Sequence, residues 1–129
     1  MQAPASEAPF PVEPAVVILA AGHSSRMNSE RSKVLHELAG EPILHHVLRL
    51  AASVQPRHRV LVTHEAGGAV RASAEARAPG LIHAIQPTAR GTGDAVRVAM
   101  EQMPDYDGPV LILCGDTPLI LPETLRQLL

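Results

Sequence analysis

The chain is poor in residues that mark several classes of protein. Of its 129 residues, one is cysteine, one is tyrosine, one is phenylalanine and none is tryptophan. The single cysteine, Cys114, excludes an intramolecular disulfide and favours a reducing compartment. No apolar run approaches the roughly 18 residues of a membrane span, and residues 1–15 hold no basic residue that a signal or transit peptide would need. We therefore expect a cytoplasmic protein without a membrane partner.

Positive charge is scarce as well. The formal net charge is −2 and the pI is near 6.4, which argues against a general nucleic-acid binder. Lys33 is the only lysine among the 11 Lys and Arg residues. It ends the polar stretch "GHSSRMNSERSK" (22–33), which also holds Arg26 and Arg31. A cationic site must therefore be local, and this stretch is the candidate for one.

Several catalytic fingerprints are missing. The stretch "AGHSSR" lacks two glycines of G-x-G-x-x-G and no G-K-[ST] occurs, so the dinucleotide and P-loop motifs are both absent. There is no G-x-S-x-G, and Ser24 and Ser25 have no identifiable base, so nucleophilic catalysis is not supported. The seven histidines never stand at metal-ligand spacing with acidic partners, so we do not expect a zinc site.

Apolar runs and helical patterns alternate along the rest of the chain. Runs rich in β-branched residues predict strands at 15–21, 58–64, 81–86 and 109–115. The first and last runs are nearly continuous apolar, which predicts cover on both faces. Apolar spacing predicts helices at 42–54, with Pro42 in its first turn, and at 66–77, 92–103 and from 122 onward. Residues 1–14, with four prolines, predict a disordered lead-in to one domain over 15–129.

This alternation predicts an α/β fold: a Rossmann-like, doubly wound, mostly parallel sheet with helices on both faces. A strand order of 3-2-1-4 reverses the chain's direction between the first and fourth strands. Ligands bind beyond the carboxyl ends of the strands at such a point. The loops that meet there are the cationic stretch 22–33 and "CGDTP" (114–118). Topology alone therefore brings Lys33 toward Asp116.

Each candidate residue also has a plainer interpretation. Lys33 is either a solvated surface cation or an ammonium that contacts phosphate. Asp116 is either a magnesium ligand or the cap of its own turn. Gln86 suits the polar edge of a base, although a solvated glutamine at a strand end is the commoner case. Cys114, within an apolar run, is expected to be a small buried residue.

Three stretches taken together resemble a known family. They are "LAAGHSSRMNSERSKVLHELAGEPILHHVL", "QPTARGTGDAV" and "CGDTPLI", in that order. They are similar to the uridylyltransferase domain of bacterial N-acetylglucosamine-1-phosphate uridylyltransferases, within the nucleoside-diphosphate-sugar transferase type of fold. The resemblance covers residues 16 to about 129, and "SKVLH" and "GTG" favour this family over the related molybdenum-cofactor nucleotidyltransferases.

The resemblance implies a Mg²⁺-dependent transfer of uridylyl from UTP to a sugar 1-phosphate, with release of pyrophosphate. Arg26 and Lys33 would be the catalytic cations that hold the phosphates, and Asp116 would be a metal ligand. The nucleotide would also be contacted by Leu19, Ala20, Ala21, Gly22, Gln86, Gly91, Thr92, Cys114 and Gly115. A cationic loop fits this chemistry because two polyanions must be aligned and neutralised.

The chain departs from the family pattern at five positions: Ser24, Ser25, Ser32, Asp94 and Cys114. Asp94 stands in place of a histidine and would bring negative charge toward a polyphosphate. The family's domain continues beyond the matched stretch, so we expect a fold truncated after its fourth strand, with no acetyltransferase site and little turnover alone. A longer form could be a homo-oligomer. A molybdenum-cofactor type of nucleotidyltransferase using CTP or GTP, and a non-catalytic nucleotide-binding fragment, remain the alternatives.

Overall fold

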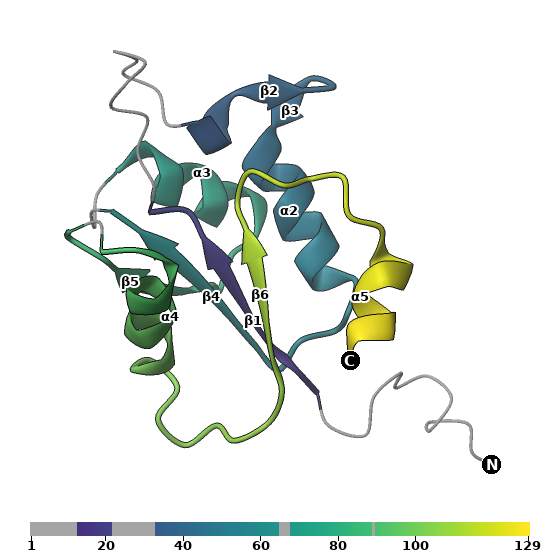
Figure 1. The fold of residues 1–129 in the computed structure, drawn as a ribbon. Helices are drawn as coiled ribbons and strands as arrows, with labels where there is room; N and C mark the ends of the chain where they lie inside the picture. Colours follow the sequence, from purple (N-terminus) through teal and green to yellow (C-terminus); the bar gives the residue numbers. More distant parts are fainter. Residues whose placement is uncertain (1–12, 22–32, 65–67, 89) are drawn as a thin grey trace.

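The computed structural model describes residues 13–21, 33–64, 68–88 and 90–129. Its main sheet has four strands in the order β5-β4-β1-β6, and all neighbouring strands run parallel (Figure 1). The strands are β1 (Ala15–Leu19), β4 (His58–Thr63), β5 (Ile82–Ile85) and β6 (Val110–Cys114). The predicted strand order 3-2-1-4 is thus confirmed.

Strand β1 forms the centre of the sheet. Val16 pairs with Arg59 of β4 on one side and with Leu111 of β6 on the other. The side chains of Val16, Val17 and Ile18 have no exposed surface. A strand covered on both faces needs apolar residues at consecutive positions, which is why "AVVIL" reads without polar alternation.

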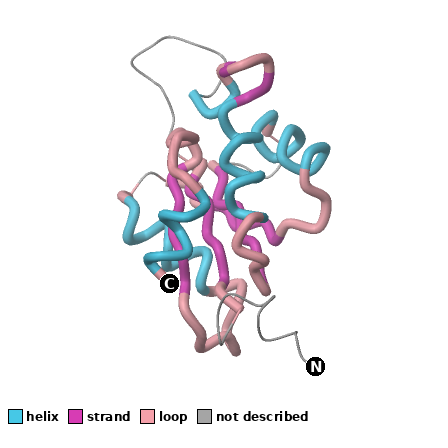
Figure 2. Tube along the Cα trace, turned by 90° about the vertical axis from the view of Figure 1, so that its right-hand side faces the viewer, coloured by secondary structure: helices cyan, strands magenta, loops and turns pink. Residues whose placement is uncertain are grey.

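Helices cover both faces of the sheet, as predicted. On one face pack α2 (Ile43–Ala52), α3 (Ala69–Arg77) and α5 (Pro122–Leu128), whose Leu44, Ala74 and Leu125 join one core cluster. On the other face α4 (Thr92–Met100) brings Ala95 and Ala99 against β1 and β4. Figure 2 shows the strands with helices on either side. The sheet is thus the middle layer between two layers of helices, as the predicted fold requires.

Three short elements were not predicted. Residues Lys33–Leu35 form a 3₁₀ turn, η2, and β2 (Glu37–Leu38) pairs antiparallel with β3 (Glu41–Pro42). The turn between β2 and β3 uses positive φ at Ala39 (56°) and Gly40 (86°), a combination that suits a tight hairpin. Pro42 consequently lies just before α2 with an extended ψ of 143°, and not in the first helical turn.

The prediction that β6 is covered on both faces is wrong. Leu111 and Leu113 are buried, but Ile112 is 45% exposed and Cys114 is exposed. Strand β6 lies at the edge of the sheet, and α4 contacts β1, β4 and β5 over the other face. Val110 still packs against the cluster on that face, whereas Ile112 and Cys114 farther along β6 stay exposed.

The chain enters the sheet through ordered residues. Pro14 was predicted to belong to the disordered lead-in, but it is fully buried. Its carbonyl accepts a hydrogen bond from the Arg57 N–H at 2.8 Å. Residues 1–12, the rest of that predicted segment, lie outside the described residues. No helix of the described part combines the length and apolar content needed to cross a membrane.

Candidate functional site

The carboxyl ends of β1 and β6 lie side by side, as the predicted crevice requires. Leu19 ends β1, and its carbonyl accepts a hydrogen bond from the N–H of Gly115, which follows β6, at 2.8 Å. The next residue, Ala20, donates its N–H to the carbonyl of Val62 in β4 at 2.8 Å. Ala20 and Ala21 are both buried. The backbones that leave these two strands are thus joined at the predicted position.

Close packing at Gly115 accounts for the absence of a side chain there. A Cβ atom at this position would lie 3.0 Å from the Leu19 carbonyl oxygen and 3.2 Å from Cγ1 of Val34. Real Cβ contacts are seldom this short, and a backbone oxygen in a sheet has little room to yield. Gly115 therefore lets β1, β6 and the η2 turn meet.

The η2 turn places Lys33 over this crevice. Val34 is buried in the core, whereas the neighbouring Lys33 side chain is 68% exposed. The Lys33 ammonium lies 3.7 Å from Oδ2 of Asp116, whose side chain is 38% exposed. Burial of Val34 thus fixes the turn, and the loop after β6 supplies the carboxylate. The predicted convergence of Lys33 and Asp116 is present in the structure.

Asp116 does not close its own turn. The hydroxyl of Thr117 donates to the Cys114 carbonyl at 2.9 Å, and the Thr117 N–H donates to the same oxygen at 3.2 Å. In the part of the chain that the structure describes, the Asp116 carboxylate contacts Lys33 alone. The turn-capping interpretation of Asp116 is therefore not what the structure shows, and the carboxylate is left to face solvent and Lys33.

Gln86 follows β5 at the same end of the sheet. Its side chain is buried, 5% exposed, so the interpretation as a solvated glutamine is wrong. Its N–H donates to the Thr63 carbonyl at 2.8 Å. Its Nε2 donates to the carbonyl of Gly91 at 3.1 Å and to Oδ2 of Asp94 at 3.0 Å. The predicted base-reading residue is thus held by a network at the start of α4.

Gly91 and Thr92 form the start of α4, as predicted. Gly91 has a φ of 92° and a ψ of 172°, a conformation that only glycine adopts readily. Thr92 is the first residue of the helix and is exposed. The glycine before this helix is therefore required by backbone geometry, independently of any ligand.

Asp94 is a functional candidate that the sequence analysis treated only as an unfavourable departure. Hydrogen bonds from Gln86 and Arg97 lower the pKa of its carboxyl group, with the guanidinium charge adding to the effect. Arg97 Nη2 and Nε lie 2.9 and 3.1 Å from Asp94 Oδ1. The charge that we expected to repel a polyphosphate is compensated inside this network. The i, i+3 spacing of Asp94 and Arg97 was the sequence signal for it.

The prediction for Cys114 also differs from the structure. It is exposed, because it belongs to the uncovered face of β6, and the expectation of a small buried residue is wrong. It still lies beside Gly115 and Asp116 at the crevice. Gly22 and Arg26, the other two predicted site residues on the loop after β1, lie outside the described residues.

The described residues hold no group of three or more His, Cys, Asp and Glu side chains that could bind a metal by themselves. A single carboxylate is nevertheless a usual protein contribution to Mg²⁺ sites in which substrate phosphates supply the other ligands. Asp116 fits that role by its exposure and by its place at the crevice, provided that Lys33 gives up its contact with the carboxylate when a metal ion binds.

Known proteins with similar sequences belong to the family that the motifs resemble. The chain is 47% identical over 111 residues to the bifunctional protein GlmU of Dinoroseobacter shibae, and 44% identical over 118 residues to that of Thermobifida fusca. These matches cover 86% and 88% of this chain but 25% and 24% of the relatives. The chain thus spans about a quarter of the length of the curated relatives it matches, and the resemblance seen in its motifs is confirmed.

Solved structures share the fold. Rv0371c from Mycobacterium tuberculosis superimposes with a TM-score of 0.69 at 23% identity, covering 90% of this chain and 58% of that one. A nucleotidyl transferase from Methanothermobacter thermautotroptrophicus gives a TM-score of 0.65 at 20% identity, covering 89% of this chain and 56% of that one. A model of the MobA-like NTP transferase domain matches residues 16–129. With this match over nearly the whole sequence, the chain belongs to the family of MobA-like NTP transferase domains.

Proposed function

We propose that this chain is the nucleotide-binding part of an enzyme that transfers uridylyl from UTP to N-acetylglucosamine 1-phosphate, giving UDP-N-acetylglucosamine and pyrophosphate. The observation that carries the proposal is the meeting of Lys33 and Asp116 at the crevice between β1 and β6. The name of the sequence relatives, bifunctional protein GlmU, supports the choice of reaction. The proposed reaction places the protein in the cytoplasm, where UTP is available.

The chemistry needs positioning and charge more than a covalent nucleophile. An oxygen of the sugar phosphate forms a bond to the α-phosphorus of UTP, and the bond from that phosphorus to the pyrophosphate leaving group breaks in line. Lys33 would hold the phosphates and neutralise charge that builds on the leaving group. Leu19, Ala20 and Ala21 would approach the nucleotide through their backbone, and Arg26 would be a second cation.

A divalent cation fits beside these groups. Asp116 would hold Mg²⁺, which when bound draws charge from the phosphate oxygens. The structure of Rv0371c in complex with manganese, which has a TM-score of 0.66 to this chain at 24% identity, supports divalent metal use. Lys33 then exchanges its contact with Asp116 for a contact with phosphate. Because the pair is exposed, breaking it costs at most about 1 kcal/mol.

Calorimetric titration of the chain with UTP in the presence of MgCl₂ tests the proposal. We expect measurable binding that weakens when MgCl₂ is omitted. Lys33→Ala should lower UTP affinity by roughly 10- to 100-fold, the scale of one charge-assisted hydrogen bond of about 1.5–3 kcal/mol. Arg126→Ala, an exposed cation on α5, is the control and should bind like the parent chain. An unchanged affinity in Lys33→Ala would contradict the role of Lys33.

A second candidate is a nucleotidyltransferase of the molybdenum-cofactor type, which uses CTP or GTP. The match to the MobA-like domain model and the "HSSR" form of the first loop favour it. The same titration with UTP, CTP and GTP separates the two candidates. Clear binding of CTP or GTP without binding of UTP would favour the second candidate over uridylyl transfer. The proposed roles of Lys33 and Asp116 toward the phosphates would remain.

A further inference from the structure

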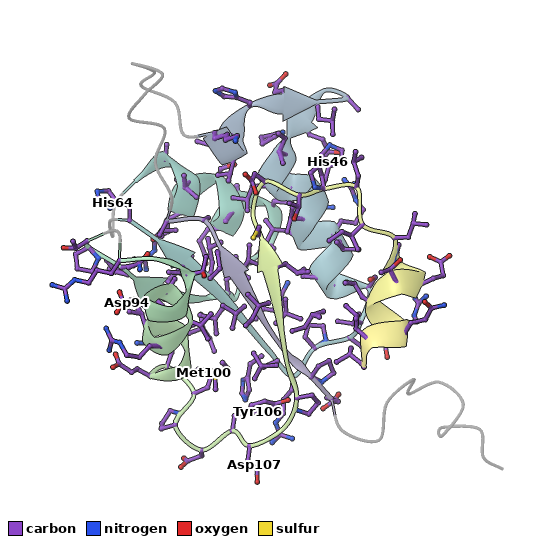
Figure 3. All side chains as sticks on the ribbon, viewed as in Figure 1. His46, His64, Asp94, Met100, Tyr106 and Asp107 are labelled. Atoms are coloured by element: carbon purple, nitrogen blue, oxygen red, sulfur yellow. The ribbon has the colours of Figure 1, made fainter. Side chains whose placement is uncertain are left out.

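A network of side chains runs from the end of β5 along α4. Gln86 Nε2 contacts Asp94 Oδ2 at 3.0 Å, and Asp94 Oδ1 contacts Arg97 at 2.9 Å. Arg97 Nη1 in turn contacts Oε2 of Glu101 at 2.6 Å. Figure 3 shows Asp94 near the end of α4 that lies with the carboxyl ends of the strands, far from Tyr106 and Asp107 at the opposite end of the sheet. The network therefore ends, at Gln86, on the ligand side of the molecule.

The partners of Gln86 determine which way its amide points. The Gly91 carbonyl and the Asp94 carboxylate are both acceptors without a proton to give. The amide end that contacts both must therefore be the NH₂ group, whose two hydrogens are used by these two oxygens at 3.1 and 3.0 Å. Neither of these hydrogen bonds uses the opposite end of the amide, Oε1. The side chain thus offers a ligand one group only, an acceptor.

Asp94 can act as a rigid anchor because both of its oxygens are engaged. Oδ1 accepts from Nε and Nη2 of Arg97, and Oδ2 is left for Gln86. Hydrogen bonds from Gln86 and Arg97 also lower the pKa of Asp94, so the carboxylate remains an acceptor at neutral pH. Gly91 fixes the second acceptor through its backbone conformation, with φ at 92°. If the Gln86 amide were reversed, its Oε1 would face the Gly91 carbonyl oxygen and Asp94 Oδ2, which are both acceptors.

We propose that Asp94 is a positioning residue for base selection: it holds the Gln86 amide so that Oε1 faces the base of the nucleotide. The inference rests on the proposed function. Such a site accepts a base that presents a ring N–H, as uracil does at N3. Cytosine is disfavoured when it is held in the same position, because its N3 has no proton and its lone pair would oppose that of Oε1; it would have to shift to present its 4-amino group. A buried site built to bond one group discriminates strongly against an analogue that lacks it.

Titrations with ligands that differ only at this group test the inference. UTP, CTP and N3-methyl-UTP are compared by calorimetry in MgCl₂, for the parent chain and for Asp94→Ala. The parent chain should bind UTP at least about tenfold more tightly than either analogue. In Asp94→Ala the Gln86 amide keeps only the Gly91 carbonyl as an acceptor, so its orientation is held less firmly and the preference should fall to within about threefold. Glu101→Ala, which removes the other partner of Arg97 and spares Asp94, should keep the parent preference.

A second variant guards against loss of the fold. Asp94→Asn keeps the shape of the side chain, and its amide can hydrogen-bond to either end of the Gln86 amide. Its preference for UTP over CTP should therefore lie between those of the parent chain and Asp94→Ala. Equal affinities of the parent chain for UTP and CTP would overturn the inference while the proposed nucleotide binding stands. A parallel loss of UTP and CTP affinity in both Asp94 variants, with the ratio unchanged, would also overturn it. Absence of binding by any nucleotide would overturn the proposed function and this inference together.

Discussion

The ammonium nitrogen of Lys33 lies 3.7 Å from Oδ2 of Asp116, although the two residues belong to segments far apart in the sequence. The contact exists because Val34 is buried and because Gly115 permits close approach to Leu19. An exposed ion pair of this kind adds between zero and about 1 kcal/mol to stability. The pairing therefore has little value for folding, and its position at the crevice is what gives it significance.

Asp116→Asn should leave the fold nearly unchanged and remove the effect of magnesium on nucleotide binding. The stability change should stay within about 1 kcal/mol, because the pair with Lys33 is exposed. UTP affinity with and without MgCl₂, measured by calorimetry, should become equal in the variant. Asp107→Asn, an exposed carboxylate at the opposite end of the sheet, is the matched control and should retain the magnesium effect. A retained effect in Asp116→Asn would refute the assignment of Asp116 as metal ligand.

Gly115→Ala should destabilise the chain by about 1–3 kcal/mol, the usual scale of overpacking. The added methyl group would lie 3.0 Å from the Leu19 carbonyl oxygen. Urea unfolding measures the change. Gly93→Ala is the control, since nothing lies within 4 Å of its Cβ and it stands inside α4. Alanine there should stabilise by up to about 1 kcal/mol through helix propensity. Equal effects of the two substitutions would contradict the packing argument.

The Cys114 thiol should react with a maleimide in the folded protein, because its side chain is exposed on the outer face of β6. It is the only cysteine in the chain, so the extent of labelling reports on this residue alone. UTP with MgCl₂ should slow the labelling, since Gly115 and Asp116 follow directly. Labelling in denaturant supplies the reference rate for full exposure. A thiol that reacts only after unfolding would show that β6 is covered in solution.

Acid should erase the stabilising effect of Asp94. Its pKa is lowered in the folded state by hydrogen bonds from Gln86 and Arg97. A lowered folded pKa gives stability that is fully present above the unfolded pKa and is lost as pH falls through the folded pKa. Melting temperatures of the parent chain and of Asp94→Asn, measured from pH 7 down to about pH 3, should therefore converge. A constant difference over this range would mean that ionisation of Asp94 contributes nothing to the fold.

The sequence predicted most of the architecture because its apolar patterns are strong. Each predicted strand and helix is present, and the strand order is the one that right-handed crossovers and a parallel sheet suggested. The exposed face of β6 was missed, since "VLILC" reads the same whether one face or two are covered. The β2–β3 hairpin was missed because two-residue strands leave no periodicity to detect.

Gln86 shows the same limit within the site. Its place after a strand was readable, but its burial depends on α4 folding back over β5, which no local pattern encodes. Asp94 was interpreted by its charge alone, because its partners Gln86 and Arg97 become neighbours only when the helix forms beside the strand end.

By itself, the sequence determined the alternation of strand and helix, the position of the cationic loop after the first strand, and the glycines at 91 and 115. These follow from local chain geometry and from the partition of apolar residues away from water. Tertiary structure decided how closely Lys33 approaches Asp116, that Ile112 and Cys114 of β6 stay exposed, and that the Gln86 amide points one way. The first two depend on contacts between segments distant in sequence, and the third depends on α4 packing beside the end of β5, so no local pattern encodes them.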